Sequence, residues 1–193
     1  MRNHFTGIGI MVLSLVTVCQ AADHPYYASY RVSFEGGSGS ATAIGERLLL
    51  TNWHVAGAAG RTGQAKSASG EVVNIRCVVS TPSYDLALCE TEATAKPLRW
   101  AAIAGAPPAA DQEVQFYGYG AGGSTLRVAH GEYMGKAQGQ NYWSAIVQSG
   151  DSGGGFFDAA GRLIGVNART AHAFPPAGGQ FFQGHSLSVP LVQ

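Results

Sequence analysis

Short segments with strand-like composition, separated by glycine-rich turns, recur along almost the whole chain. Turn sequences such as EGGSGS, AGAAGRTGQ, IAGAPPAADQ and YGAGGS divide these segments. The chain has 27 glycines among 193 residues and no long amphipathic helical stretch. Many short strands with tight connections favour an all-β barrel or sandwich. The expected strands are Tyr26–Phe34, Ser40–Ile44, Arg47–Thr51, Val72–Val79, Leu86–Glu90, Glu113–Tyr119, Ser124–Tyr133, Tyr142–Val147, Gly155–Asp158, Leu163–Asn167 and Phe181–Val189.

The length and charge of the chain limit the classes of function. A chain of 193 residues can bury one or two small cores. Basic and acidic residues number 12 each, so the formal net charge of zero provides no basic field for nucleic acid. The proline-containing segment Gly105–Asp111 is the best candidate for a crossover between two halves of similar size.

The first residues have the pattern of an export signal. Arg2 gives a weakly positive start, an apolar run follows over residues 8–18, and Ala21 and Ala22 supply small residues for cleavage. The apolar run is short for a membrane span, so an uncleaved anchor is the weaker alternative. A lipid anchor at Cys19 is disfavoured because the residue before it is not small. We predict a signal peptide over residues 1–21 and a secreted or periplasmic protein.

Export leads to an oxidising compartment, in which paired cysteines form disulfides. Removal of the signal leaves Cys77 and Cys89, which lie in the strand-like runs EVVNIRCVV and DLALCE. A hairpin turning through STPSY would place the two cysteines opposite each other. We therefore predict a Cys77–Cys89 disulfide, with two buried free thiols as the alternative.

The sequence GDSGG at residues 150–154 offers a turn suited to a nucleophilic serine. Such a serine must project its Oγ from a tight turn while two backbone N–H groups point to the place where an oxyanion forms. Glycines around Ser152 allow the required backbone angles and leave space for a substrate. We expect the N–H groups of Gly150 and Ser152 to form this oxyanion hole. A Gly-Ser-Gly turn alone is usually only a loop, so the assignment needs partners.

A base and a carboxylate can be assigned from the remaining sequence. A serine needs a neighbouring base to become a nucleophile, and RLLLTNWHVAG places His54 at the end of an apolar strand. The other histidines lie near the termini, in expected loops or in the last strand, where surface or structural roles are the default. Asp85, in SYDLALCE, opens an apolar strand and is the favoured carboxylate to orient the imidazole. Taken alone, Asp85 would be read as an ordinary strand-start residue.

The motifs TNWHVAG, DLAL and GDSGGG, in this order, resemble those of the trypsin/chymotrypsin-like serine peptidases, with the bacterial trypsin-like and HtrA-type branches closest. The resemblance implies two six-stranded antiparallel Greek-key barrels with an active site in the cleft between them. The barrel of residues 22–107 would carry His54 and Asp85. The barrel of residues 108–193 would carry Ser152 and the oxyanion hole. Asp151 would organise the backbone beside that hole.

The resemblance also gives expectations for substrate binding. By position relative to the serine, Ile146 would form the floor of the primary pocket, with Val147 beside it and Gln148 and Ser149 along the approach. Because no aspartate stands at the floor, we expect a preference for uncharged, small or medium side chains at the cleaved position. The segment following the Leu163–Asn167 strand resembles the edge that pairs with extended substrates, and it comprises Ala168, Arg169 and Thr170.

The sequence departs from the family in two places. Ala168 stands where the family often has a serine that bonds to the catalytic aspartate. No Ile-Val-Gly-Gly-type sequence occurs at a processing site, so activation by a new N-terminus beside Asp151 is not expected.

The expected protein is a monomeric serine endopeptidase that acts on protein or peptide substrates through an acyl-enzyme. No His-Glu-x-x-His and no Cys/His cluster with ligand spacing occurs, so we expect no metal and no cofactor. We expect neither nucleic acid nor, after signal removal, a membrane as partner. The main alternative is an inactive binding protein with the same fold. An α/β-hydrolase is disfavoured because strand-like sequence follows Ser152.

Overall fold

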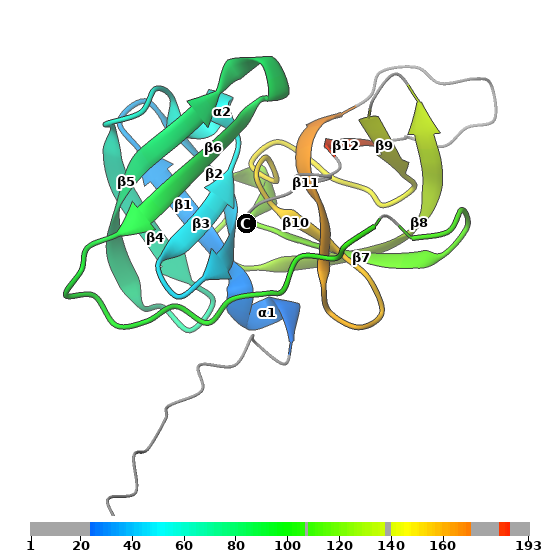
Figure 1. Ribbon diagram of the computed structural model, residues 1–193, viewed down its shortest axis with the longest axis horizontal. Coiled ribbons are helices and arrows are strands. Elements are labelled where there is room, and N and C mark those ends of the chain that lie inside the picture. Colours follow the sequence, from blue (N-terminus) through cyan, green and yellow to red (C-terminus); the bar gives the residue numbers. More distant parts are fainter. Residues whose placement is uncertain (1–23, 107, 138–139, 171–181, 186–193) are drawn as a thin grey trace, which may run out of the picture.

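The structure is a computed structural model that describes residues 24–106, 108–137, 140–170 and 182–185. Two six-stranded antiparallel sheets each close into a barrel, and the barrels lie side by side (Figure 1). This confirms the predicted all-β, two-barrel fold. Within the described ranges, no helix has the length and apolar character needed to cross a bilayer.

The first barrel is formed by strands β1 to β6, and pairing of β1 with β4 closes it. Alternation of buried and exposed residues along β5 turns Ile75 and Cys77 into the barrel interior, as expected for a strand with one solvated face. Val32 and Leu49 pack against them in the same core. The strands are β1 (Ser29–Phe34), β2 (Gly37–Gly45), β3 (Leu48–Thr51), β4 (Thr62–Ser67), β5 (Val72–Thr81) and β6 (Leu86–Thr91).

The second barrel is formed by strands β7 to β12, and pairing of β10 with β7 closes it. Its core is aromatic: the Trp143 ring stacks on Phe156 with centroids 4.6 Å apart, and Phe116 lies 5.0 Å from Phe156. The strands are β7 (Glu113–Gly118), β8 (Arg127–Ala137), β9 (Gln140–Trp143), β10 (Gly155–Phe157), β11 (Leu163–Thr170) and β12 (Phe182–His185).

A third apolar cluster joins the barrels. Leu50 of the first barrel packs in it with Tyr117, Phe157 and Leu163 of the second. The short helix α1 (Pro25–Ala28) adds Ala28 to this cluster and lies below the junction of the barrels (Figure 1). Burial of apolar area between the barrels fixes their relative position, on which any site at their interface depends.

The connection between the barrels bonds to both of them. The amide of Leu98 donates to Glu46 O at 2.7 Å, and that of Ala101 to Ala43 O at 2.9 Å, both in the first barrel. From residue 102 onward the partner is Leu163 of the second barrel, whose carbonyl accepts from Ala104 N at 2.8 Å. The change of partner therefore comes between residues 101 and 102, before the expected crossover at Gly105–Asp111.

The observed elements differ from the expected ones in several places. Strand β4 was not expected, because its sequence TGQAKS contains only one apolar side chain, the buried Ala65. Tyr26 to Ala28 are helical because Pro25 opens a helical turn, and the His24 ring accepts a hydrogen bond from Tyr26 N. The strand expected over Tyr142–Val147 ends at Trp143. Of the expected strand Phe181–Val189, only β12 lies within the described residues, and the predicted signal peptide lies outside them.

The two cysteines face each other across strands β5 and β6. Cys77 is the direct partner of Cys89 in the strand register, so the predicted hairpin placement is confirmed. Both side chains are buried and are free thiols in the structure, so the predicted disulfide is absent from it. Burial raises the pKa of the Cys77 thiol, which disfavours the thiolate form needed for thiol chemistry.

Candidate active site

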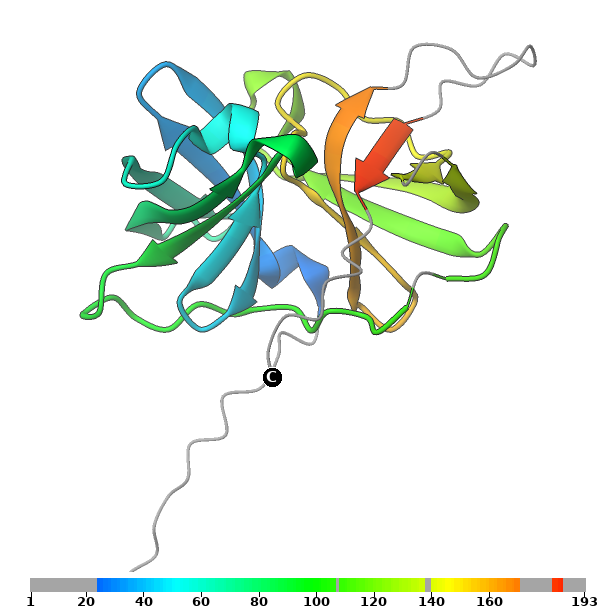
Figure 2. The same ribbon diagram turned by 45° about the horizontal axis from the view of Figure 1, so that its top comes forward.

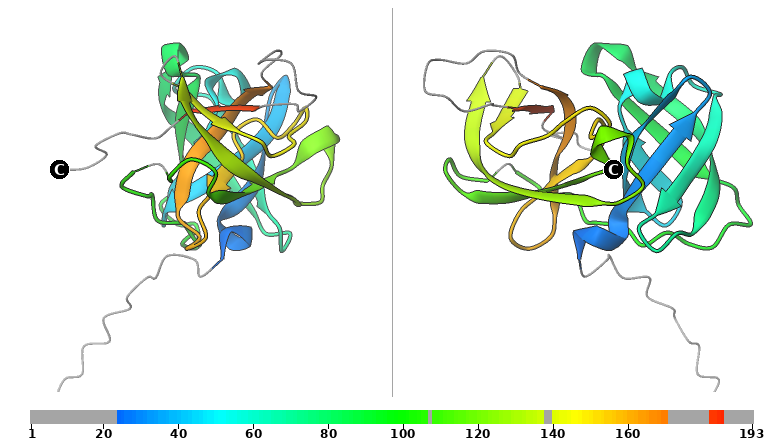
Figure 3. Two further views of the ribbon diagram at one scale, coloured as in Figure 1. Left: turned by 90° about the vertical axis from the view of Figure 1, so that its right-hand side faces the viewer. Right: turned by 180° about the vertical axis from the view of Figure 1, so that it is seen from behind.

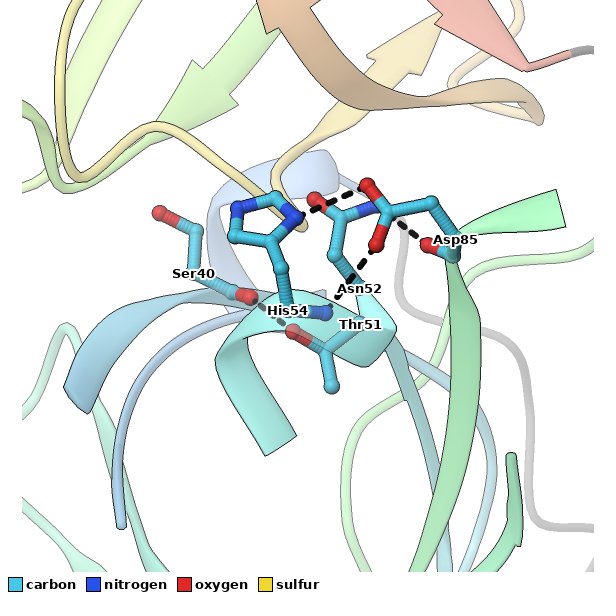
Figure 4. A network of polar contacts seen from close by, with 5 residues as sticks. All are labelled: Ser40, Thr51, Asn52, His54 and Asp85. Atoms are coloured by element: carbon cyan, nitrogen blue, oxygen red, sulfur yellow. Dashed lines mark hydrogen bonds and ion pairs between the residues drawn. The ribbon is translucent and has the colours of Figure 1, made fainter. Parts of the chain in front are cut away.

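His54 and Asp85 form a hydrogen-bonded pair at the edge of the first barrel. His54 follows β3, on the short helix α2 (Trp53–Ala56), and Asp85 ends the 3-10 turn η1 (Pro82–Tyr84) just before β6. Asp85 Oδ2 lies 2.7 Å from His54 Nδ1, and Asp85 Oδ1 accepts from the His54 backbone N–H at 3.0 Å (Figure 4). Two contacts from one carboxylate fix both the imidazole ring and the backbone that carries it.

The backbone of Asp85 is held as firmly as its carboxylate. Its carbonyl accepts from Asn52 Nδ2 at 2.9 Å and from Trp53 N at 3.2 Å. Asp85 adopts a left-handed conformation with φ of 53°, which aspartate tolerates better than most residues and which these contacts stabilise. The Asp85 side chain is only 7% exposed, whereas that of His54 is 43% exposed. The ring is thus anchored on its buried side and open on the other.

Ser152 lies in the turn between β9 and β10, where two glycines have positive φ values, 93° at Gly150 and 85° at Gly153. The carbonyl of Ser149 accepts from Ala121 N at 2.6 Å. Because a trans peptide is planar, the Gly150 N–H points away from Ala121. Neither the Gly150 N–H nor the Ser152 N–H donates to any part of the chain that the structure describes. The turn therefore presents two backbone donors without an acceptor in the described residues, and their role as an oxyanion hole stays a prediction.

Asp151 anchors this turn from inside the second barrel. Its carboxylate is fully buried and accepts from the Arg127 guanidinium at the start of β8 and from Gln148 N at 2.9 Å. Burial raises the pKa of the Asp151 carboxyl, and the Gln148 amide and the Arg127 charge lower it to a smaller extent. The partly buried Arg127 thus stands beside Asp151. The sequence motifs point to Asp151 but carry no signal for Arg127.

A backbone contact brings the serine turn against the first barrel. Ser40 N, in β2, donates to Ser152 O at 2.7 Å. In Figure 2, α2 and η1 lie at the edge of the first barrel that faces this turn, and Figure 3 shows the same arrangement from behind. The structure therefore places the backbone of Ser152 at the junction with the barrel that carries the His54–Asp85 pair.

Residues 20–166 match the family described as the trypsin-like peptidase domain, a span that includes His54, Asp85 and Ser152. The chain belongs to the trypsin-like peptidase family. It is a serine endopeptidase by this membership. No curated protein sequence matches the chain.

Solved structures similar to this peptidase share its fold. The inactive form of the protease Rv3671c of M. tuberculosis aligns with a TM-score of 0.69 at 20% identity, covering 84% of this chain and 85% of that one. The HtrA-type protease AlgW with a tripeptide aligns at 0.70 and 25% identity, covering 86% and 57%. A serine endoprotease from Yersinia pestis aligns at 0.70 and 22% identity, covering 83% and 60%. The peptidase thus spans less than two thirds of the last two chains.

A shallow cavity of about 320 Å³ lies beside the imidazole of the peptidase. It is lined by Trp53, His54, Pro82, Asp85 and Ala168. Ala168 belongs to β11 of the second barrel, so the cavity is shared by both barrels. Within the described residues, no group of three or more His, Cys, Asp and Glu side chains is close enough to hold a metal ion.

Strand β11 has an open edge next to the serine turn. Asn167 bonds through its backbone to Gly153 N and Gly154 O, each at 2.8 Å. Beyond Asn167, the strand pairs with β12 on one side, through Arg169 and Thr170, and has no strand partner on its other side within the described ranges. The predicted substrate-binding segment 168–170 therefore includes an unpaired edge.

The structure gives the surroundings of the residues expected to line the primary pocket, and their place in that pocket stays a prediction. Val147 is buried in the core of the second barrel, and Gln148 and Ser149 bond to Asp151 and Ala121 as described above. Ile146 is 61% exposed. Its place in the primary pocket stays a prediction.

Proposed function

We propose that the peptidase cleaves peptide bonds with Ser152 as nucleophile, His54 as general base and Asp85 as the carboxylate that orients the base. The observation that carries this proposal is the 2.7 Å contact between His54 Nδ1 and Asp85 Oδ2. A neutral imidazole that donates its Nδ1–H to the carboxylate keeps a lone pair on Nε2. Nε2 is then free to accept the proton of a serine hydroxyl at the open side of the ring.

The reaction proceeds by acyl transfer to water. Ser152 Oγ attacks the peptide carbonyl carbon while its proton passes to His54 Nε2, and the oxyanion is stabilised by the N–H groups of Gly150 and Ser152. The C–N bond then breaks, and His54 gives the proton to the leaving amine. Water attacks the acyl-enzyme with His54 again as base, which releases the carboxylic acid and returns the proton to Ser152 Oγ.

Substrates would bind as extended protein or peptide segments. The open edge of β11 at residues 168–170 can accept a further strand through its backbone groups. The cavity lined by Trp53, His54, Pro82, Asp85 and Ala168 lies next to this edge and can receive a side chain. The alternative of an inactive binding protein is not favoured, because His54, Asp85 and Ser152 are all present.

The proposed triad is tested by labelling and by substitution. Purified protein treated with a fluorophosphonate should gain one adduct, located at Ser152 by mass spectrometry. Ser152→Ala should lower kcat on the order of 10⁴-fold or more while leaving the unfolding midpoint unchanged, because only the nucleophile is removed. His54→Ala should abolish labelling of Ser152. Turnover that persists in Ser152→Ala would end the assignment.

The proposal includes a preference for substrates with uncharged, small or medium side chains at the cleaved position. Its basis is the absence of an acidic residue at the positions Ile146 to Ser149. Digestion of a peptide library, with the products identified by mass spectrometry, should give cleavage mainly after residues of this kind. A cleavage profile dominated by Lys and Arg would contradict the assignment.

The peptidase would act as a monomer outside the cytoplasm. Its secreted or periplasmic location is supported by the signal-like pattern of residues 1–21. The balanced charge of the chain, with 12 basic and 12 acidic residues, supports protein substrates over nucleic acid.

A further inference from the structure

Ser40 is the point at which the two halves of the proposed active site are bonded to each other. It lies on β2 of the first barrel and is 1% exposed. Its hydroxyl donates to Gly150 O at 2.9 Å and accepts from Tyr119 N at 2.8 Å, and both partners belong to the second barrel. Its backbone N–H bonds to Ser152 O at 2.7 Å.

Ser40 is also bonded toward the side that carries the base. Its carbonyl accepts from Thr51 Oγ1 at 2.7 Å, and Thr51 is the last residue of β3, three residues before His54 (Figure 4). In this view the His54 ring lies between Ser40 and the Asp85 carboxylate. One residue is thus bonded to the strand leading to the base and to the turn bearing the nucleophile.

Glycines on both sides make this close approach possible. A Cβ added to Gly153 would lie 2.0 Å from Ser40 O, and one added to Gly39 would lie 2.9 Å from Ser152 O. Both distances are shorter than real Cβ contacts, so side chains at these positions would separate the two segments. The glycines at positions 39 and 153 therefore allow β2 and the serine turn to touch through their backbones at Ser40, with no side chain between them.

We propose that Ser40 is a positioning residue, whose hydroxyl sets the orientation of the oxyanion turn. A hydroxyl can donate and accept at once, so it satisfies the partly buried carbonyl of Gly150 and the buried amide of Tyr119, and an alanine would supply neither bond. With the Gly150 carbonyl held by Ser40 and the Ser149 carbonyl held by Ala121, the peptide groups on both sides of Gly150 are fixed. The direction of the Gly150 N–H is thereby fixed, and Ser40 N also holds the carbonyl of Ser152. On this proposal, these bonds together aim the N–H groups of Gly150 and Ser152 at one place.

This inference rests on the proposed peptidase function, because an oxyanion hole matters only where an oxyanion forms. Donors in such a hole stabilise the transition state more than the bound substrate. A less fixed turn should therefore lower kcat and leave KM nearly unchanged. A residue that only joined the barrels would, on substitution, lower stability without changing kcat of the folded protein.

The test compares Ser40→Ala with Ser29→Ala as a matched control. Ser29 is a second buried serine whose hydroxyl also makes a bond of 2.9 Å, to Pro25 O in α1, which lies at the opposite end of the barrels from α2 (Figure 1). Ser40→Ala should lower kcat and the rate of fluorophosphonate labelling by about 10- to 100-fold, with KM changed by less than about threefold. Ser29→Ala should keep wild-type kcat. Urea unfolding of each variant would show that the assays report folded protein.

Ser40→Cys gives a second variant of similar volume, in case Ser40→Ala does not fold. A thiol donates and accepts hydrogen bonds weakly. The rate of fluorophosphonate labelling of Ser40→Cys should therefore lie between those of wild type and Ser40→Ala. If only Ser40→Cys folds, its rate should lie below that of wild type. If Ser40→Ala or Ser40→Cys folds and matches wild type in kcat and labelling, the role of Ser40 is refuted while the peptidase function stands. If the wild-type protein is neither labelled at Ser152 nor active, the proposed function itself fails.

Discussion

At the scale of single residues, Asp151 is an ionisable group that folding removes completely from water. Its carboxylate is fully buried, and burial raises its pKa above the ordinary value although Gln148 and Arg127 act in the opposite direction. A raised pKa in the folded state means that folding favours the protonated form. The carboxylate thus lowers the free energy of unfolding at neutral pH and lowers it less in acid. Arg127 is the residue that limits this loss.

Replacement of Arg127 by methionine should therefore destabilise the protein in a pH-dependent way. The variant leaves a buried carboxylate without its cation, which costs about 3–5 kcal/mol in comparable sites. Loss of the cation raises the pKa of Asp151 further. As the pH falls, the buried carboxylate of the variant takes up a proton, and the destabilisation caused by its unpaired charge is relieved. The difference from wild type in urea unfolding should be largest at about pH 8 and should shrink at about pH 5.

Arg76→Met provides the matched control for this prediction. Arg76 bonds Glu90 at 2.7 Å, but the two side chains are 59% and 35% exposed, and such surface pairs contribute about 0–1 kcal/mol. Equal losses of stability in Arg127→Met and Arg76→Met would contradict the assigned role of Arg127. So would a loss in Arg127→Met that does not change between the two pH values.

The residues of the proposed site differ in how far sequence could predict them. His54, Asp85 and Ser152 lie in local motifs, and for the first two the structure gives a direct contact. Ser40 and Arg127 carry no such local signal. Ser40 bonds to a residue 110 positions away, and Arg127 to one 24 positions away, so each role exists only after the barrels have formed.

At the scale of strands and helices, prediction succeeded where apolar side chains alternate or cluster. β3 and β5 are of this kind, and each was expected close to its observed position. β4 was missed because its polar sequence TGQAKS is held by backbone pairing with β1 on one side and β5 on the other. A strand in the interior of a closed sheet needs few apolar side chains, since two neighbours satisfy its backbone groups.

The position of the turn that bears Ser152 can be predicted from the sequence, whereas its conformation cannot. The glycine turn around Ser152 can be predicted from the sequence, but the bonds that Ser40 and Ala121 make to the carbonyl groups of this turn cannot. The same holds for Ile146, whose exposure is decided by how the second barrel folds around the buried Val147. Motif spacing alone gives the order of functional groups along the chain, whereas their orientation depends on tertiary contacts.

At the scale of the whole molecule, the predicted export and the oxidation state of the two cysteines can be tested together, because export leads to an oxidising compartment. Cys77 and Cys89 are register partners on the β5–β6 hairpin, which also carries Asp85 at its turn. In an oxidising compartment, a dithiol–disulfide oxidant can take two electrons and two protons from the thiols and leave an S–S bond. Such a bond would close a short loop around Asp85 and restrict the unfolded chain.

Protein recovered after export should therefore lack residues 1–21 and contain no free thiol. Intact mass and N-terminal sequencing would locate the cleavage, and alkylation of denatured protein with and without reductant would count the thiols. Loops of this size stabilise by roughly 2–3 kcal/mol, so reduction should lower the Tm by on the order of 5 °C. A Cys77→Ala/Cys89→Ala variant should show no effect of reductant on its Tm. Two alkylated cysteines in exported protein kept without reductant would instead show the buried free thiols of the structure. Strand pairing alone would then hold the β5–β6 hairpin.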